Sequence, residues 1–186
     1  MGFVLIFLYS TYFQNMLCNK KGVISLDDIN PEQGLGDELF LTISSLVPII
    51  NVDLLVYNDK GQFLLTKRND PHCGKGWHIP GGCIRFKETC EERIRMVAQK
   101  ELGINQLSIE KEPIKVFEII ERKHRPIENQ NERAHFITLV CKCHIDESYI
   151  INNGNLTAED AGYIKWFDKL PDDLLSIQNC YREILQ

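Results

Sequence analysis

The sequence predicts an α/β fold, because strand-like and helix-like segments alternate along most of its length. Residues 50–57 (INVDLLVY) and 62–68 (QFLLTKR) are β-rich runs, and the turn-forming residues between them predict a hairpin. Residues 88–102 contain neither Pro nor Gly and end at Gly103, as expected for a helix with a C-terminal glycine cap. Strands and helices in this order are typical of the α/β class.

Further elements are expected on both sides of this helix. Residues 112–123 and 134–145 have the composition of two longer strands joined by a polar loop. Residues 163–167 (YIKWF) form a last predicted strand, and Pro171 is well placed to start a C-terminal helix. Before the hairpin, Asp37 is the expected N-cap of a short helix.

Size and composition indicate one globular domain. With 186 residues, of which 44% are hydrophobic and 25% charged, the chain can bury a core and is neither disordered nor fibrous in composition. We expect residues 36–186 to form the domain and residues 1–35 an N-terminal segment, in which Met16 is a candidate true start. Residues 1–13 are apolar but lack the basic region and cleavage site of a signal peptide, so no stable membrane association is expected.

Charge and cysteine usage narrow the partners and the compartment. A formal net charge of -5 argues against nucleic acid as a partner, although a few local cations or a divalent metal would still bind a small phosphorylated substrate. The seven cysteines form no CxxC pair and no zinc-like cluster with histidine, which favours a reduced, cytoplasmic setting. Cys141 and Cys143 are two apart in a predicted strand and are expected to face the core together.

The spacing of glycine and glutamate residues around the central helix carries the functional signal. WHIPGG ends at Gly82, Glu88 follows after five residues, and the helix ends in ELGI at residues 101–104. This resembles the Nudix box, G-x5-E-x7-R-E-U-x-E-E-x-G-U, in which U is aliphatic. The resemblance covers roughly residues 49–167. It implies an α/β/α sandwich around a mixed sheet, and a hydrolase that acts on a nucleoside diphosphate linked to another group.

The resemblance also implies a metal site and its supports. The Gly81 carbonyl and the Glu101 carboxylate would hold Mg²⁺, with Mn²⁺ as the alternative ion. A hard cation of this kind takes oxygen ligands and keeps several waters. Glu88 would buttress the loop, and Gly82 and Gly103 complete the structural part of the box.

The box is incomplete in this chain. Met96, Val97 and Lys100 stand where the pattern has Arg and two Glu residues. Because Val97 and Glu101 share a helix face, the usual acid cluster shrinks to one carboxylate, which disfavours multi-metal pyrophosphatase chemistry. A reduced box is similar to that of the GDP-mannose mannosyl hydrolase branch, which uses one Mg²⁺ and attacks the anomeric carbon of the sugar.

That branch takes a further metal ligand and its general base from a Gln-His pair before the last strand. The corresponding positions here are Asp160 and Ala161, so the histidine has no counterpart. Asp160 or its neighbour Glu159 is the candidate for metal binding or general base catalysis. The alternative is that Asp160 is a solvated loop acid.

Three other residues are candidates for substrate binding. Arg68 and Arg85 flank the glycine turn and could contact a diphosphate, since guanidinium donors suit phosphate oxygens. His78 within WHIPGG could hydrogen-bond the substrate. The alternatives are surface cations for the two arginines and a buried, satisfied side chain for the histidine.

Three functions therefore remain open. The first is hydrolysis of a nucleotide-sugar, GDP-mannose-like, to sugar and nucleoside diphosphate. The second is a pyrophosphohydrolase for other nucleoside diphosphate derivatives, and the third is a Nudix-fold binding module in which Lys100 neutralises Glu101 without metal. Metal dependence separates the third from the others. The sequence leaves open the base, the sugar, whether water attacks carbon or phosphorus, and a possible homodimer.

Overall fold

The computed structural model describes residues 18–19, 22–23, 29–70, 74–120, 135–146 and 148–185. Its elements, in chain order, are β1 (Cys18–Asn19), β2 (Gly22–Val23), η2 (Pro31–Gln33), α2 (Gly36–Ser44), β3 (Ile49–Tyr57), β4 (Phe63–Asp70), β5 (Gly74–His78), β6 (Gly81–Cys83), α3 (Cys90–Leu102), β7 (Ser108–Ile109), β8 (Lys115–Ile120), β9 (His135–His144), β10 (Ile164–Phe167) and η3 (Ser176–Glu183).

The main sheet is mixed and is organised around β3. This strand runs parallel to β9 over its whole length and antiparallel to β6. Strands β10, β4, β3, β9 and β7 lie in that order, while β5, β6 and β8 pair with β4, β3 and β9 respectively. The two arms of the predicted hairpin share a single register pair, Tyr57 with Phe63, because β3 finds its other partners in β9 and β6.

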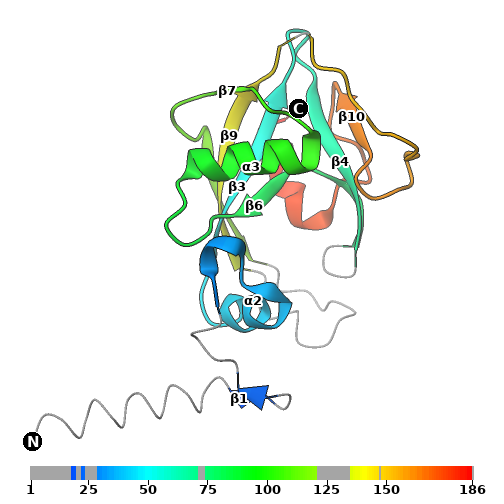
Figure 1. Ribbon diagram of the computed structural model, residues 1–186. Helices are drawn as coiled ribbons and strands as arrows, with labels where there is room; N and C mark the ends of the chain where they lie inside the picture. Colours follow the sequence, from blue (N-terminus) through cyan, green and yellow to red (C-terminus); the bar gives the residue numbers. More distant parts are fainter. Residues whose placement is uncertain are drawn as a thin grey trace, which may run out of the picture.

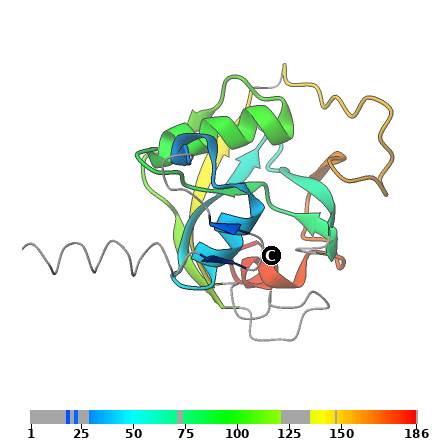
Figure 2. The ribbon, with the colours of Figure 1, turned by 60° about the horizontal axis from the view of Figure 1, so that its bottom comes forward.

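Helical segments cover the two faces of this sheet, which confirms the predicted fold class. Helix α3 crosses one face and η3 lies behind the other, while α2 sits at one end (Figures 1 and 2). Alternate residues of β3 serve the two cores, since successive side chains of a strand point to opposite faces. Val52 and Leu54 pack with Ile94 of α3, whereas Leu55 packs with Tyr181 of η3.

Helix α3 begins and ends where its local sequence directs. Thr89 is the N-cap, and its side chain and that of Glu92 form a reciprocal capping box. Gly103 adopts a left-handed conformation with φ 67° at the C-terminal end, as the sequence predicts. The helix therefore has a fixed start and a fixed end relative to the glycine turn that precedes it.

Two helix boundaries differ from the sequence prediction. No helix starts at Pro171, because the following residues pair with β5 through Asp173 O and Leu175 N, and η3 begins only at Ser176 as a 3₁₀-helix. Asp37 is not an N-cap, since α2 starts at Gly36. The predicted polar loop at residues 125–133 lies outside the described residues.

The two cysteines of β9 and the apolar character of the helices are also subjects of prediction. Cys141 and Cys143 are both buried in the core beneath α3, as predicted. No helix within the described residues has the length and apolar character needed to cross a membrane.

Candidate active site

The double-glycine turn is shaped by close contact with β3. Gly81 pairs with Asp53 across the ladder, and a Cβ atom on Gly81 would lie 2.0 Å from Asp53 Oδ1. A Cβ on Gly82 would lie 3.0 Å from Val97 Cγ2 of α3. The absence of side chains at both positions therefore lets this turn lie between β3 and the helix.

Glu88 joins the loop after the turn to the first turn of α3. Its Oε2 accepts hydrogen bonds from the Arg85 amide at 2.9 Å and from Arg93 Nε at 2.7 Å, and Arg93 Nη2 lies 2.6 Å away. Both side chains of the Glu88–Arg93 pair are largely buried. The box pattern has Arg at position 96, where this chain has Met96. Arg93 lies about one helical turn earlier, so the helix still carries a cationic side chain close to that position.

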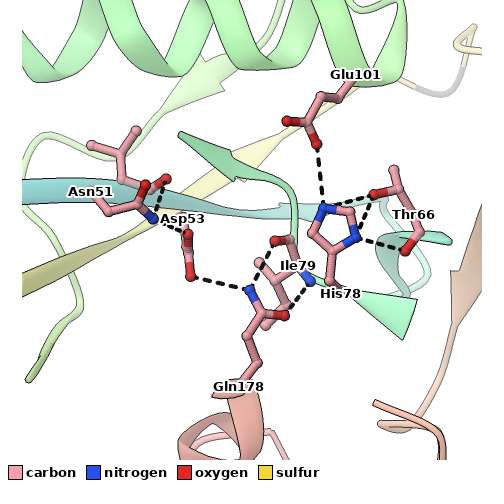
Figure 3. A network of polar contacts seen from close by, with 8 residues as sticks. Asn51, Asp53, Thr66, His78, Ile79, Glu101 and Gln178 are labelled. Atoms are coloured by element: carbon pink, nitrogen blue, oxygen red, sulfur yellow. Dashed lines mark hydrogen bonds and ion pairs between the residues drawn. The ribbon is translucent and has the colours of Figure 1, made fainter. Parts of the chain in front are cut away.

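His78 places its ring between β4 and the end of α3 (Figure 3). Its Nδ1 lies 2.9 Å from the Thr66 carbonyl oxygen, which can only accept, so Nδ1 donates the proton. This orientation leaves Nε2 3.5 Å from Glu101 Oε2. His78 is buried, whereas the Glu101 side chain is 35% exposed. The fold thus brings together two of the residues selected from the sequence.

Asp53 is a buried acid beneath the glycine turn that sequence reasoning missed. Its Oδ1 accepts a 2.6 Å hydrogen bond from Asn51 Nδ2, and its Oδ2 accepts one of 2.6 Å from the Tyr181 hydroxyl. Burial raises the pKa of Asp53 from 3.8 to about 6; Tyr181 and His78 oppose this shift, and the nearby Glu101 charge adds to it. The signal in the sequence is a lone charge within the apolar run INVDLLVY.

Asp160 lies in the exposed loop before β10. Its Oδ2 accepts hydrogen bonds of 2.7 Å from both the amide and the hydroxyl of Thr157, and these bonds lower the pKa of Asp160. The neighbouring Glu159 pairs with Lys75 at 2.6 Å. A lowered pKa makes a carboxylate a weaker base, which counts against proton abstraction by Asp160.

The two candidate phosphate-binding arginines occupy different settings. Arg68 is exposed on β4, opposite Gly76 of β5. Arg85 donates from Nη1 to the Glu32 carbonyl oxygen at 3.0 Å, which ties it to the short η2 helix. Arg85 would have to give up this bond to contact a substrate through that nitrogen.

Comparison with known families decides the identity of this arrangement. Residues 47–175 match the model of the NUDIX domain, which is well over half of the chain. The chain belongs to the Nudix family. The geometry described above is thus that of a Nudix box whose helix retains Glu101 and lacks the acids at positions 97 and 100.

The comparisons also give individual proteins to which this chain is similar. The low-salt glycan biosynthesis protein Agl8 of Haloferax volcanii is 32% identical over 75 residues, which cover 40% of this chain and 47% of that protein. The match therefore spans less than half of that relative's length. The MutT NUDIX hydrolase from Burkholderia pseudomallei is 21% identical with a TM-score of 0.50, over 74% of this chain and 97% of that one. The MutT/nudix family protein from Enterococcus faecalis is 23% identical with a TM-score of 0.47, over 65% and 44%.

The donor set of this Nudix box fits one hydrated cation. Within the residues that the structure describes, no group of three or more His, Cys, Asp or Glu side chains could hold a metal ion. Among the described residues, the one polar partner of the Glu101 carboxylate is His78, whose Nε2 lies 3.5 Å from Oε2. This partly exposed carboxylate is therefore available to a ligand. A carboxylate is a donor that hard divalent cations accept, and bound waters can complete their coordination.

The raised pKa of Asp53 predicts a pH dependence of stability in the metal-free protein. Because the folded state binds this proton more tightly than the unfolded chain, the free energy of unfolding should fall as pH rises from about 4 to about 6. Asp53→Asn should remove this part of the pH dependence. Guanidinium unfolding in chelator at both ends of the window measures it; an equal stability difference between the two proteins at both pH values would contradict it.

Proposed function

We propose that this Nudix hydrolase is a magnesium-dependent enzyme that cleaves a nucleotide-sugar, GDP-mannose-like, into free sugar and nucleoside diphosphate. The observation that carries this proposal is the single available carboxylate at the end of α3, Glu101, with Val97 and Lys100 at the two other acid positions. The name of the Haloferax volcanii relative, a glycan biosynthesis protein, supports a sugar-containing substrate.

The proposed reaction replaces one bond at the anomeric carbon. Water forms a bond to that carbon, the bond from carbon to the diphosphate oxygen breaks, and its electron pair leaves with the diphosphate. A proton from the water passes to a base or to solvent. A bound Mg²⁺ would neutralise charge on the departing diphosphate. One ion can suffice for this departure, which agrees with a box reduced to one acid.

The chain's own residues would divide this work. Glu101 and the Gly81 carbonyl would hold the ion, with Asp160 as the further ligand or the general base. Arg68 and Arg85 are the candidates for diphosphate binding, and Arg85 would first release its hydrogen bond to the Glu32 carbonyl oxygen.

His78 would act on Glu101 or on the substrate from a fixed position. Hydrogen bonds with Thr66 fix the orientation of the ring and keep Nε2 on the side of Glu101. A ring fixed in this way can accept a hydrogen bond from a sugar hydroxyl through Nε2 or, in its protonated form, donate one to the Glu101 carboxylate. We place the enzyme in the cytoplasm, where its cysteine thiols, among them that of the exposed Cys90, would stay reduced.

Turnover of a nucleotide-sugar panel tests the proposed function. We expect proton and phosphorus NMR time courses to show release of free sugar and nucleoside diphosphate from a GDP-mannose-like substrate with Mg²⁺, and none with a chelator. Nucleoside triphosphates serve as the control substrates. Sugar phosphate with nucleoside monophosphate would instead establish pyrophosphohydrolase chemistry. Substrate-induced thermal stabilisation without any turnover would favour a binding module.

A further inference from the structure

The chain that leads into η3 runs alongside β5 as an additional strand-like partner. Trp77 donates its amide to Asp173 O and accepts from Leu175 N, both at 2.9 Å, and Trp77 forms a parallel bridge with Leu174. A Cβ atom on Gly76 would lie 2.6 Å from Asp173 O, so this approach depends on a glycine. The C-terminal segment is thus in direct backbone contact with the strand that enters the glycine turn.

A side chain of η3 continues this pairing at Ile79, two residues beyond Trp77. The buried Gln178 accepts from the Ile79 amide at 2.7 Å through Oε1 and donates to the Ile79 carbonyl at 3.1 Å through Nε2 (Figure 3). One amide group therefore satisfies both backbone groups of Ile79. On the other side of the turn, the Leu54 amide donates to Pro80 O at 2.8 Å. The backbone before Gly81 is held from both sides.

The same helix reaches the acid beneath Gly81. Gln178 Nε2 lies 3.4 Å from Asp53 Oδ2, and the fully buried Tyr181 donates its hydroxyl to that oxygen at 2.6 Å. Residues three apart eclipse one another in a 3₁₀-helix, so Gln178 and Tyr181 project from one side of η3. Gly81 pairs with Asp53 across the ladder, and η3 therefore fixes both the residue before the turn and the residue beneath it.

We propose that Gln178 and Tyr181 are positioning residues that hold the Ile79–Gly81 turn and Asp53 in the arrangement needed for metal binding. This inference rests on the proposed metal-dependent function. On this proposal, η3 both packs against the sheet and positions residues of the active site. Outer contacts that orient metal ligands typically change metal affinity about 10- to 100-fold when they are removed.

The test is the affinity of the full-length chain for Mn²⁺ alone, measured by isothermal titration calorimetry. Gln178→Met keeps the length of the side chain and removes its hydrogen bonds; Tyr181→Phe keeps the ring and removes the hydroxyl. The exposed Ser176→Ala on the same helix is the control. We expect a loss of Mn²⁺ affinity of about 10-fold or more for Gln178→Met, and a smaller loss for Tyr181→Phe.

Three outcomes would overturn the inference, and none depends on turnover. They are unchanged Mn²⁺ affinity in a folded Gln178→Met protein, an equal loss in the Ser176→Ala control, and a wild-type chain that binds no Mn²⁺. If Gln178→Met does not fold, Tyr181→Phe decides. A purely structural role would lower thermal stability without changing Mn²⁺ affinity. Intact Mn²⁺ binding by a wild-type chain that hydrolyses no nucleotide-sugar would refute the proposed function and leave the positioning role standing.

Discussion

Replacing Glu101 by Gln should lower kcat/KM for the nucleotide-sugar by roughly 100- to 1,000-fold, because a bound metal is worth several kcal/mol of charge stabilisation. Glu101 is the one carboxylate left at the three acid positions near the end of the box helix, since Val97 and Lys100 occupy the other two. No neighbouring acid on that helix face can take over its role. Steady-state kinetics at saturating Mg²⁺ measure the loss.

A matched substitution separates this effect from a general change in charge. Glu91→Gln lies on the same helix, where Glu91 forms an exposed pair with Arg95 at 2.7 Å. It should change kcat/KM by less than about twofold, as expected for an exposed pair one turn apart. Equal losses in the Glu101 and Glu91 variants, or full activity of Glu101→Gln, would remove Glu101 from the mechanism.

Replacing Glu88 by Ala should destabilise the protein by about 3–5 kcal/mol, the usual cost of removing one partner of a buried ion pair. The variant leaves the Arg93 guanidinium buried without its carboxylate and the Arg85 amide without its acceptor. The glycine turn then loses its connection to the first turn of α3. Guanidinium unfolding monitored by circular dichroism measures the change.

The double variant Glu88→Ala with Arg93→Met identifies the cause of this loss. Because it removes the stranded charge together with its partner, it should be more stable than Glu88→Ala alone. Glu91→Ala, which breaks an exposed pair, should cost less than about 0.5 kcal/mol. A double variant less stable than the single one would show that the ion pair is not the source of the stability.

Much of the fold could be predicted because the signals are local. Helix α3 has a capping box at Thr89, an uninterrupted run of helix formers and a terminal Gly103, and each acts within a few residues. The error after Pro171 has the opposite origin. A proline-led polar segment reads as a helix start, but its backbone pairs with β5, about 100 residues earlier in the chain, and such a partner leaves no local mark.

The candidate site divides in the same way. Gly81, Glu88 and Glu101 were selected from their spacing along one turn and one helix, and the structure places Glu101 beside His78. Asp53 left only a weak signal as a charge in an apolar strand. Gln178 left none, because its partner Ile79 is 99 residues away and the contact exists only once the sheet and η3 have assembled.

The most direct test of attack at carbon is the position of the solvent oxygen after hydrolysis in ¹⁸O-labelled water. Mass spectrometry of the products of the Mg²⁺-dependent reaction gives this position. We expect the label to enter the free sugar and to be absent from the nucleoside diphosphate. Label in a phosphate group of either product would contradict it, because the water would then have attacked phosphorus.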